Sequence, residues 1–321
     1  MRVLVTGAGG FIGSHVTERL LRDGHEVTAL VRYSSTGAVG FLEAHRSAPG
    51  LTLVLGDIAD PRLVREAMRG CDVVLHLAAL IGIPYSYEAP GSYVSTNVHG
   101  TLAVLEAARD LGTRRVVLTS TSEVYGTAIT SPITEDHPKQ AQSPYSATKI
   151  AADALGEAYA RSFGLPVVVL RPFNTFGPRQ SPRAVIPTIF GQLATGATSI
   201  SLGSLWPQRD FTYVSDTVEG FAACLTAPTI EGRTVHLGTG IAVSIGELAT
   251  LCQEVSGREV DVIHDDDRDR PPASEVGLLL SDPSLAADLL GWRPRVELRE
   301  GLARTWESIV ASPPPDRGYS R

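Results

Sequence analysis

The stretch that decides the fold reads Met1-Arg-Val-Leu-Val-Thr6 followed by Gly7-Ala-Gly-Gly10-Phe-Ile-Gly13. A short apolar run predicts a strand over Arg2–Thr6, and the helical periodicity that follows predicts a helix over Ile12–Arg22. Glycines between a strand and a helix allow a tight turn, let phosphate oxygens approach the backbone, and leave the N–H groups of the helix end facing the anion. The stretch therefore predicts a dinucleotide-binding turn rather than a plain strand-to-helix turn. The residues expected to hold the dinucleotide here are Gly7, Gly10, Phe11, Ile12 and Gly13.

Strands and helices alternate through the first half of the chain. Most strand candidates are continuously apolar, as expected of parallel strands that are covered on both faces. The alternation predicts an α/β fold with a doubly wound parallel sheet of the Rossmann type. The expected strands are Arg2–Thr6, Glu26–Val31, Thr52–Leu55, Asp72–Leu75, Arg115–Thr119 and Pro166–Leu170, and the expected helices are Ile12–Arg22, Pro61–Met68, Val94–Leu111 and Tyr145–Phe163.

The pattern loosens after about Arg171, where turn-rich segments mix with helical ones. We expect a dinucleotide-binding domain over residues 1–171 and a smaller C-terminal α+β lobe over residues 172–321, with some chain crossing back to the sheet domain. No Gly/Ser-rich or Pro-rich linker separates the two, so we expect the lobe to pack on the sheet domain. Its helices are expected near Ala184–Ala194, Ser215–Leu225, Ile245–Glu254 and Leu298–Ile309.

Composition narrows the class of protein. The chain has 321 residues, of which 43% are hydrophobic, and a formal net charge of −7, which argues against a general binder of nucleic acid or of an anionic membrane. The start has no signal-peptide pattern, and no apolar run reaches the roughly 18 residues of a membrane helix. Three scattered cysteines fit a reducing compartment, so we expect a cytoplasmic protein. His76 is expected to be packed at a strand end, and no His/Cys/Asp cluster predicts a metal site.

The end of the second strand bears on the choice of dinucleotide. An NAD enzyme usually places an acidic residue there, which binds the ribose 2′-hydroxyl. This chain instead reads Val31-Arg32-Tyr33-Ser34-Ser35. Arg32 and the nearby hydroxyls could accommodate the 2′-phosphate of NADP. If Arg32 instead stacks on adenine or faces solvent, it does not discriminate between NAD and NADP. The sequence therefore predicts NAD or NADP, with Arg32 in the site.

Lysine is rare in this chain: of 28 basic residues only Lys139 and Lys149 are lysines. Codon bias explains the count, but a position that keeps lysine can need a compact ammonium whose pKa can be tuned. Lys149 ends Tyr145-Ser-Ala-Thr-Lys149, one helical turn after the tyrosine. An ammonium beside a phenol, with the positive nicotinamide of a cofactor nearby, favours the phenolate and lowers the pKa of the tyrosine. A tyrosine tuned in this way can take a hydroxyl proton while hydride leaves the same carbon. We predict that Tyr145 and Lys149 are catalytic and contact the cofactor, and that Lys139 has no such role.

A third catalytic group should reach the same substrate oxygen from the end of a neighbouring strand. The strand Arg115–Thr119 runs into Ser120-Thr121-Ser122-Glu123-Val124-Tyr125-Gly126, which offers hydroxyls at that edge. Thr121 is the best candidate, with Ser120 as a supporting neighbour.

These motifs resemble the extended short-chain dehydrogenase/reductases that act on nucleotide sugars. The resemblance covers essentially the whole chain, through Thr-Gly-x-x-Gly-x-x-Gly, Tyr-x-x-x-Lys, Arg171-Pro-Phe-Asn174 and Arg209-Asp-Phe-Thr-Tyr-Val214. In detail the chain is most similar to 4,6-dehydratases of nucleotide-activated hexoses, and among these to the UDP-N-acetylglucosamine 4,6-dehydratases of legionaminic-acid-type pathways. The resemblance implies a regenerated, tightly bound cofactor and a homodimer. It adds these residues to the cofactor site: Asp57, Ile58, Leu77, Ala78, Ala79 and Asn97.

Glu123 discriminates within this family. A 4-epimerase needs only reversible oxidation at C4, whereas a 4,6-dehydratase must also remove the C5 proton and expel the C6 hydroxyl. The family's glutamate at this position does the first. Many dehydratases carry Asp before it, where this chain has Ser122, so the acid at C6 is unassigned and Glu123 acting twice is the first hypothesis.

The resemblance also implies substrate contacts and leaves alternatives open. Arginine suits bidentate phosphate binding, and a diphosphate needs such cations. Three other interpretations stay open: a 4-epimerase, a UDP-glucuronate decarboxylase and a non-catalytic cofactor-binding regulator. The decarboxylases share the motif Thr-Ser-Glu-Val-Tyr-Gly. The residues expected to contact a nucleotide-diphosphate sugar are Ser122, Asn174, Val185, Arg209 and Arg270.

Overall fold

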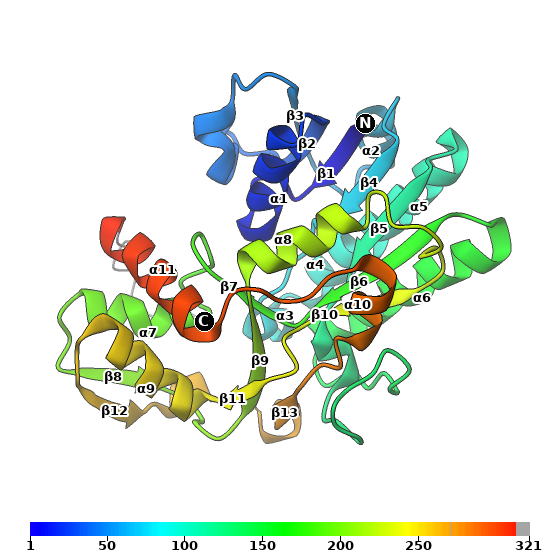
Figure 1. The fold of residues 1–321 in the computed structure, drawn as a ribbon. Coiled ribbons are helices and arrows are strands. Elements are labelled where there is room, and N and C mark those ends of the chain that lie inside the picture. The colour runs from blue at the N-terminus through cyan, green and yellow to red at the C-terminus, as the bar shows by residue number, and fades with distance from the viewer. Residues whose placement is uncertain (270, 313–321) are drawn as a thin grey trace.

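A parallel sheet of seven strands forms the centre of the protein (Figure 1). The computed structural model describes residues 1–269 and 271–312. The strand order β10-β6-β5-β4-β1-β2-β3 reverses direction at β1, as in a doubly wound fold, which confirms the predicted class. The strands are β1 (Arg2–Thr6), β2 (Glu26–Arg32), β3 (Leu51–Gly56), β4 (Val73–His76), β5 (Arg115–Thr119), β6 (Val167–Pro172) and β10 (Thr234–Leu237).

Both faces of the sheet are covered by helices. Val3 and Val5 of β1 pack in one cluster with α1 (Phe11–Arg22) and α8 (Val214–Ala223), while Leu4 packs on the opposite face. Alternate residues of a strand point to opposite faces, so a continuously apolar strand fills two cores at once. The helices of the second face are α2 (Pro61–Met68), α5 (Gly100–Leu111) and α6 (Pro144–Phe163).

The predicted helix Val94–Leu111 is helical throughout, but its first part is π-helical rather than α-helical. A π-helical segment, η2 (Val94–His99), precedes α5 and follows two short helices, α3 (Ile83–Glu88) and α4 (Pro90–Tyr93). The Asn97 side chain accepts a hydrogen bond from Leu80 N and donates to Leu80 O, so this turn is tied to the loop after β4. Wider turns of this kind break the regular period and often occur at functional sites.

The C-terminal lobe is built from small sheets and helices beside the carboxyl ends of the central strands (Figure 1). Strand β9 pairs with β7, β11 and β13, and β8 pairs with β12. The buried Asp210 carboxylate of β9 accepts hydrogen bonds from Thr239, Gly240 and Ser281, which joins three distant segments. The elements are β7 (Asn174–Phe176), α7 (Val185–Ala194), β8 (Ser199–Leu202), β9 (Gln208–Tyr213), β11 (Ala242–Ser244), α9 (Ile245–Ser256), β12 (Asp261–His264), β13 (Leu278–Leu279), α10 (Ser284–Leu290) and α11 (Leu298–Ala311).

Four short 3-10 turns complete the described elements: η1 (Gly40–His45), η3 (Ser122–Tyr125), η4 (Asp266–Arg268) and η5 (Pro272–Ser274). Over residues 1–269 and 271–312, no helix has both the length and the apolar character that a membrane span needs.

Candidate active site

The glycine turn after β1 leaves no room for side chains. Gly7 has φ +68°, and a Cβ there would lie 2.8 Å from Ala78 N. A Cβ on Gly13 would lie 2.2 Å from Gly7 O, so α1 packs directly on the turn. The first N–H groups of α1, which begins at Phe11, have no partner within the helix. A bare turn under a helix N-terminus fits the pyrophosphate of a dinucleotide.

The predicted adenine end of the site lies where β2 and β3 finish. Arg32 pairs with Gly56 between these strands, which brings Arg32 beside the segment that carries Asp57 and Ile58. Arg32 and Asp57 are exposed, and Ile58 is buried. Asp57 Oδ1 accepts a hydrogen bond from Ala59 N at 2.9 Å, which shapes the turn after β3.

A buried hydrogen-bond chain connects this turn to the middle of the site. Thr6 Oγ1 accepts from both Leu77 N (3.1 Å) and Ala78 N (3.0 Å), so its own proton is left for His76 Nδ1 at 2.9 Å. His76 Nε2 must then carry the ring proton, which it donates to Thr101 Oγ1 at 3.1 Å. The sequence predicted a packed histidine but not this link, because its partners are dozens of residues away.

Asn97 extends the chain of hydrogen bonds to α6, the helix that carries Tyr145. Thr101 Oγ1 donates to Asn97 O at 2.6 Å, and Asn97 Nδ2 donates to Thr148 Oγ1 at 3.0 Å. Thr148 Oγ1 in turn donates to Tyr145 O at 2.7 Å. The segment Leu77–Ala79 and the start of α6 are therefore held in one framework.

Tyr145 lies at the start of α6, where Ser143 caps the helix and Pro144 opens it. Its phenol shares a hydrogen bond with the Thr121 hydroxyl, so the structure brings together the two residues that the sequence predicted as partners. The ring is 7% exposed and packs against Ile83 and Tyr93, whose ring meets it edge-on at 6.3 Å.

The pKa of Tyr145 in the protein by itself depends mainly on burial. Burial raises the pKa of this phenol well above its usual value, and the nearby Glu123 carboxylate adds to the rise. The hydrogen bond from Thr121 lowers it in part. The lowering predicted from the sequence includes a bound nicotinamide and stays a prediction; in the protein by itself, the buried phenolate would lose its hydration.

Lys149 is buried one turn further along α6. Its Nζ donates to Thr119 O at 2.6 Å, at the end of β5. Burial lowers the pKa of Lys149 to about 8, with Asp153 acting to raise it and Arg171 to lower it. The ammonium is thus poised to titrate near neutral pH, as a tunable lysine should be.

The residues of the turn after β5 differ in their burial and in their hydrogen-bond partners. Thr121 caps η3 and accepts from Glu123 N at 3.3 Å, while Ser122 is buried. The half-buried Glu123 lies close enough to Tyr145 to influence its pKa. Ser120 does not support Thr121 as expected, because its hydroxyl donates to Asp153 Oδ2 at 2.9 Å.

The predicted substrate residues of the lobe lie on three elements. Asn174 on β7 donates to Asp210 O at 3.3 Å, and the half-buried Val185 begins α7. Arg209 on β9 is buried, and its guanidinium donates to Glu275 Oε1 at 3.1 Å and Val276 O at 2.7 Å. Arg270 lies outside the described residues.

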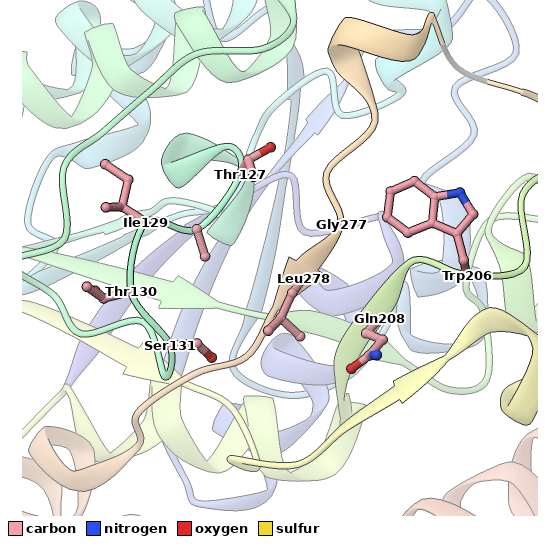
Figure 2. Close-up of a pocket in the computed structure, with 9 residues that line it drawn as sticks. Thr127, Ile129, Thr130, Ser131, Trp206, Gln208, Gly277 and Leu278 are labelled. Atoms are coloured by element: carbon pink, nitrogen blue, oxygen red, sulfur yellow. The ribbon is translucent and has the colours of Figure 1, made fainter.

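A cavity of about 400 Å³ lies beside this part of the lobe. Figure 2 shows the loop of residues 127–131 on one side of it and Trp206, Gln208, Gly277 and Leu278 on the other. None of the residues that line it is a predicted site residue, and Gln208 is the sequence neighbour of Arg209. The cavity therefore adjoins the predicted substrate region without including the side chains predicted to be catalytic.

Comparisons with known proteins agree with this geometry. The profile of the GDP-mannose 4,6 dehydratase family matches residues 4–305. A UDP-glucose 4-epimerase of Mycolicibacterium smegmatis is 36% identical over 96% of this chain and 98% of its own length. A dTDP-glucose 4,6-dehydratase of Streptomyces antibioticus is also 36% identical, over 95% of this chain and 91% of its own. The crystal structure of a dTDP-glucose 4,6-dehydratase from Streptomyces venezuelae with NAD bound has a TM-score of 0.88 at 32% identity and covers 97% of this chain and 98% of its own.

Proposed function

Because this chain belongs to the GDP-mannose 4,6 dehydratase family of NAD(P)-dependent enzymes, we propose that it is a nucleotide-sugar 4,6-dehydratase. The best substrate candidate is UDP-N-acetylglucosamine, which would become the 4-keto-6-deoxy sugar. The observation that carries the proposal is the Glu123 carboxylate beside the hydrogen-bonded pair Thr121 and Tyr145.

The first half of the reaction is proton removal at O4. Tyr145 takes the O4 proton, and Thr121 holds the same oxygen through its hydroxyl. Lys149, one helical turn further along α6, supplies a positive charge to this part of the site. A nicotinamide cofactor, when bound, would supply the hydride chemistry at C4 and C6, and its positive charge would favour the phenolate. The pKa of Tyr145 is high in the protein by itself. We therefore expect its phenol to take the O4 proton only when cofactor and substrate are both bound.

The second half is elimination of water. A 4-keto group acidifies the C5 proton, and Glu123 is placed to remove it as a general base. With Ser122 where many relatives have an aspartate, Glu123 then returns a proton to the departing C6 hydroxyl. When C6 receives the hydride, C5 receives a proton, which balances the proton that Tyr145 took from O4. Substrate and product therefore differ by one water, and no net oxidation occurs. Added NAD(P)⁺ should therefore not be needed in stoichiometric amounts.

The 4-epimerase reaction is the second candidate, favoured by the UDP-glucose 4-epimerase that is 36% identical. Both reactions share the C4 oxidation, and they part at C5. Glu123 has a task in elimination and none in epimerisation, which is why we place the dehydratase first.

Product mass separates the candidates. The protein is incubated with UDP-N-acetylglucosamine, UDP-glucose, dTDP-glucose and UDP-glucuronate in separate reactions, and each product is weighed by mass spectrometry. Loss of one water supports the dehydratase. An unchanged mass with a new epimer supports the epimerase, loss of CO₂ a decarboxylase, and no reaction with any of them a non-catalytic binder.

A substitution at Glu123 tests its role separately. Glu123→Gln should still oxidise C4, seen as reduced-cofactor absorbance, but lose elimination by at least about 100-fold, the usual contribution of a general base. Glu106→Gln, on the exposed face of α5, is the control and should change neither step. Full dehydratase activity in Glu123→Gln would remove Glu123 from the mechanism.

The remaining site assignments follow from the same proposal. NAD or NADP would be held by the glycine turn and by Arg32, Asp57, Ile58, Leu77–Ala79 and Asn97. The sugar nucleotide would contact Ser122, Asn174, Val185, Arg209 and Arg270. We place residues 1–171 in the cofactor domain and residues 172–321 in the substrate lobe. The three cysteines are free and buried, which fits a reducing compartment such as the cytoplasm.

A further inference from the structure

Two cationic side chains lie within ion-pair distance of one buried carboxylate, that of Asp153 on α6, and a third, Lys149, is one helical turn away. Its side chain is 2% exposed. Asp153 Oδ2 accepts from Arg171 Nη2 at 2.6 Å and from Ser120 Oγ at 2.9 Å. Lys139 Nζ lies 3.8 Å from the same oxygen. The third cation, Lys149, precedes Asp153 by one helical turn, so both side chains lie on one face of α6.

The two lysines of the chain are therefore both neighbours of Asp153, but in different ways. Lys139 is partly exposed and donates to Glu157 Oε1 at 2.7 Å, so it has a partner of its own. Lys149 is buried, and its one hydrogen bond to a described residue goes to Thr119 O, which carries no formal charge. A buried ammonium without a nearby anion loses its proton. Asp153 is the anion that raises the pKa of Lys149.

The other charged and titratable groups around this cluster do not replace that anion. Arg171 on β6 lowers the pKa of Lys149, and His76 on β4 faces Lys149 as a neutral ring. The Asp153 carboxylate contributes to raising the pKa of two phenols, Tyr145 on α6 and Tyr125 in η3. Both phenols are therefore neutral near pH 7. Asp153 is thus the acidic group that acts on Lys149 among these neighbours.

A second set of contacts keeps the carboxylate in place. Arg171 is fully buried and also donates to the Tyr125 hydroxyl, which bonds to His236 Nε2 at 2.6 Å. Arg171 Nε also donates to Ser120 Oγ at 3.3 Å, so the two side chains that hydrogen-bond to Asp153 are bonded to each other. The Asp153 carboxylate is therefore held by β6 and the residue after β5, in addition to its place on α6.

We infer that Asp153 is a positioning residue, which keeps Lys149 in its ammonium form and directed at the end of β5, while Arg171 and Ser120 fix the carboxylate. The inference rests on the proposed catalytic role of Lys149. It extends the site to three residues that touch neither sugar nor cofactor in the proposal. It also predicts that the pH range of activity depends on Asp153.

The scarcity of lysine makes a direct test possible. In protein labelled with ¹³C-lysine, NMR should show two lysine side-chain signals. In Lys139→Arg, the one remaining signal is that of Lys149, which assigns it. In Asp153→Asn the Lys149 titration should move to lower pH by about one pH unit or more, the usual effect of losing an opposite charge at this range. The alkaline limb of kcat/KM should move with it, whereas Asp153→Glu should restore both.

Asp216→Asn is the matched control for the loss of a buried carboxylate. Asp216 Oδ2 accepts from Arg295 N and Val296 N, far along the chain from α6. This variant should lose stability yet leave the Lys149 titration where it is. A folded Asp153→Asn protein with an unchanged Lys149 titration would overturn the inference.

Asp153→Asn leaves Arg171 buried without its carboxylate, which can prevent folding. In that case the double variant Asp153→Asn/Arg171→Gln carries the test, because it leaves no lone buried charge. The titration should still move to lower pH, since Asp153 has the larger effect on Lys149 than Arg171 has. An unchanged titration there also rejects the inference. The NMR measurement uses no substrate, so failure of the dehydratase proposal in the mass assay would be seen separately.

Discussion

At the scale of single residues, the environment of each lysine predicts its sensitivity to arginine. Lys149 is buried with its Nζ against Thr119 O, where a larger, permanently charged guanidinium does not fit. Lys149→Arg should therefore lose at least about 100-fold in kcat/KM, the scale of an acid–base contribution. Lys139→Arg, which can keep the exposed pair with Glu157, should stay within about twofold of wild type. Equal losses in steady-state assays would leave codon bias as the explanation of the lysine count.

His76 predicts a pH dependence of stability. Burial lowers the pKa of this imidazole to about 3, whereas the unfolded chain takes up the proton near pH 6.5. Below that pH the unfolded state binds a proton that the folded state refuses, so stability falls as pH falls. The slope approaches about 1.4 kcal/mol per pH unit. His76→Asn removes this titration, and its urea unfolding free energy should vary less steeply than that of wild type between about pH 6 and pH 4.5.

The hydrogen-bond chain through His76 also fixes a tautomer. The ring proton should be on Nε2, because Thr6 Oγ1 already accepts from two backbone N–H groups. The ¹⁵N shifts of the imidazole, measured across neutral and mildly acidic pH, should report a neutral Nε2–H ring throughout. A protonated ring near pH 6 would contradict the assigned network.

At the scale of elements, the contact between β1, the glycine turn and α1 is the most constrained. Gly13→Ala places a Cβ 2.2 Å from Gly7 O, where backbone has to move. We expect a loss of about 1–3 kcal/mol in unfolding free energy and a large loss of dinucleotide affinity by calorimetry. Gly246→Ala, in the first turn of α9, is the control, since the nearest atom would be 3.7 Å away. It should be neutral or slightly stabilising, and equal effects would mean that the turn is not the constraint.

Two element-level differences have clear physical causes. The predicted helix over Val94–Leu111 begins with a π turn because Asn97 is bonded to Leu80 and Thr148, a tertiary demand that overrides periodicity. Strand β10 was not predicted: Thr234–Leu237 reads Thr-Val-His-Leu, with a β-branched start but a histidine in place of a continuous apolar run. It is short and follows an irregular segment, so local pattern alone could not assign it to the central sheet.

At the scale of the whole molecule, the exposed side of α6 predicts assembly. Phe163 is 55% exposed at the end of α6, and the Arg109 guanidinium of α5 lies 5.2 Å from its ring. We propose that α5 and α6 form the homodimer interface that the family resemblance implies. Light scattering should give a dimer for wild type and a monomer for Phe163→Asp. Val310→Asp, on α11 and 51% exposed, should remain a dimer, and a monomeric wild type would reject the proposal.

The sequence by itself determined what depends on near neighbours. The glycine turn, the continuously apolar strands and the Tyr145–Lys149 spacing each occupy a few consecutive residues, and each specifies its own backbone geometry. The class of sheet and the pairing of Tyr145 with Thr121 could be predicted for that reason, since parallel strand ends meet at one edge.

Only the tertiary structure decided the environment of those residues. Asp153 meets Ser120 and Arg171 across three elements, and Asp210 gathers Thr239 and Ser281 from separate segments. In the protein by itself, burial raises the pKa of Tyr145 and lowers that of Lys149 to about 8. A pKa depends on the whole shell of charges and solvent around a group, and that shell comes from segments that no local pattern links. The order of residues determined which groups are present, and the packing of distant segments determined the charge that each one carries.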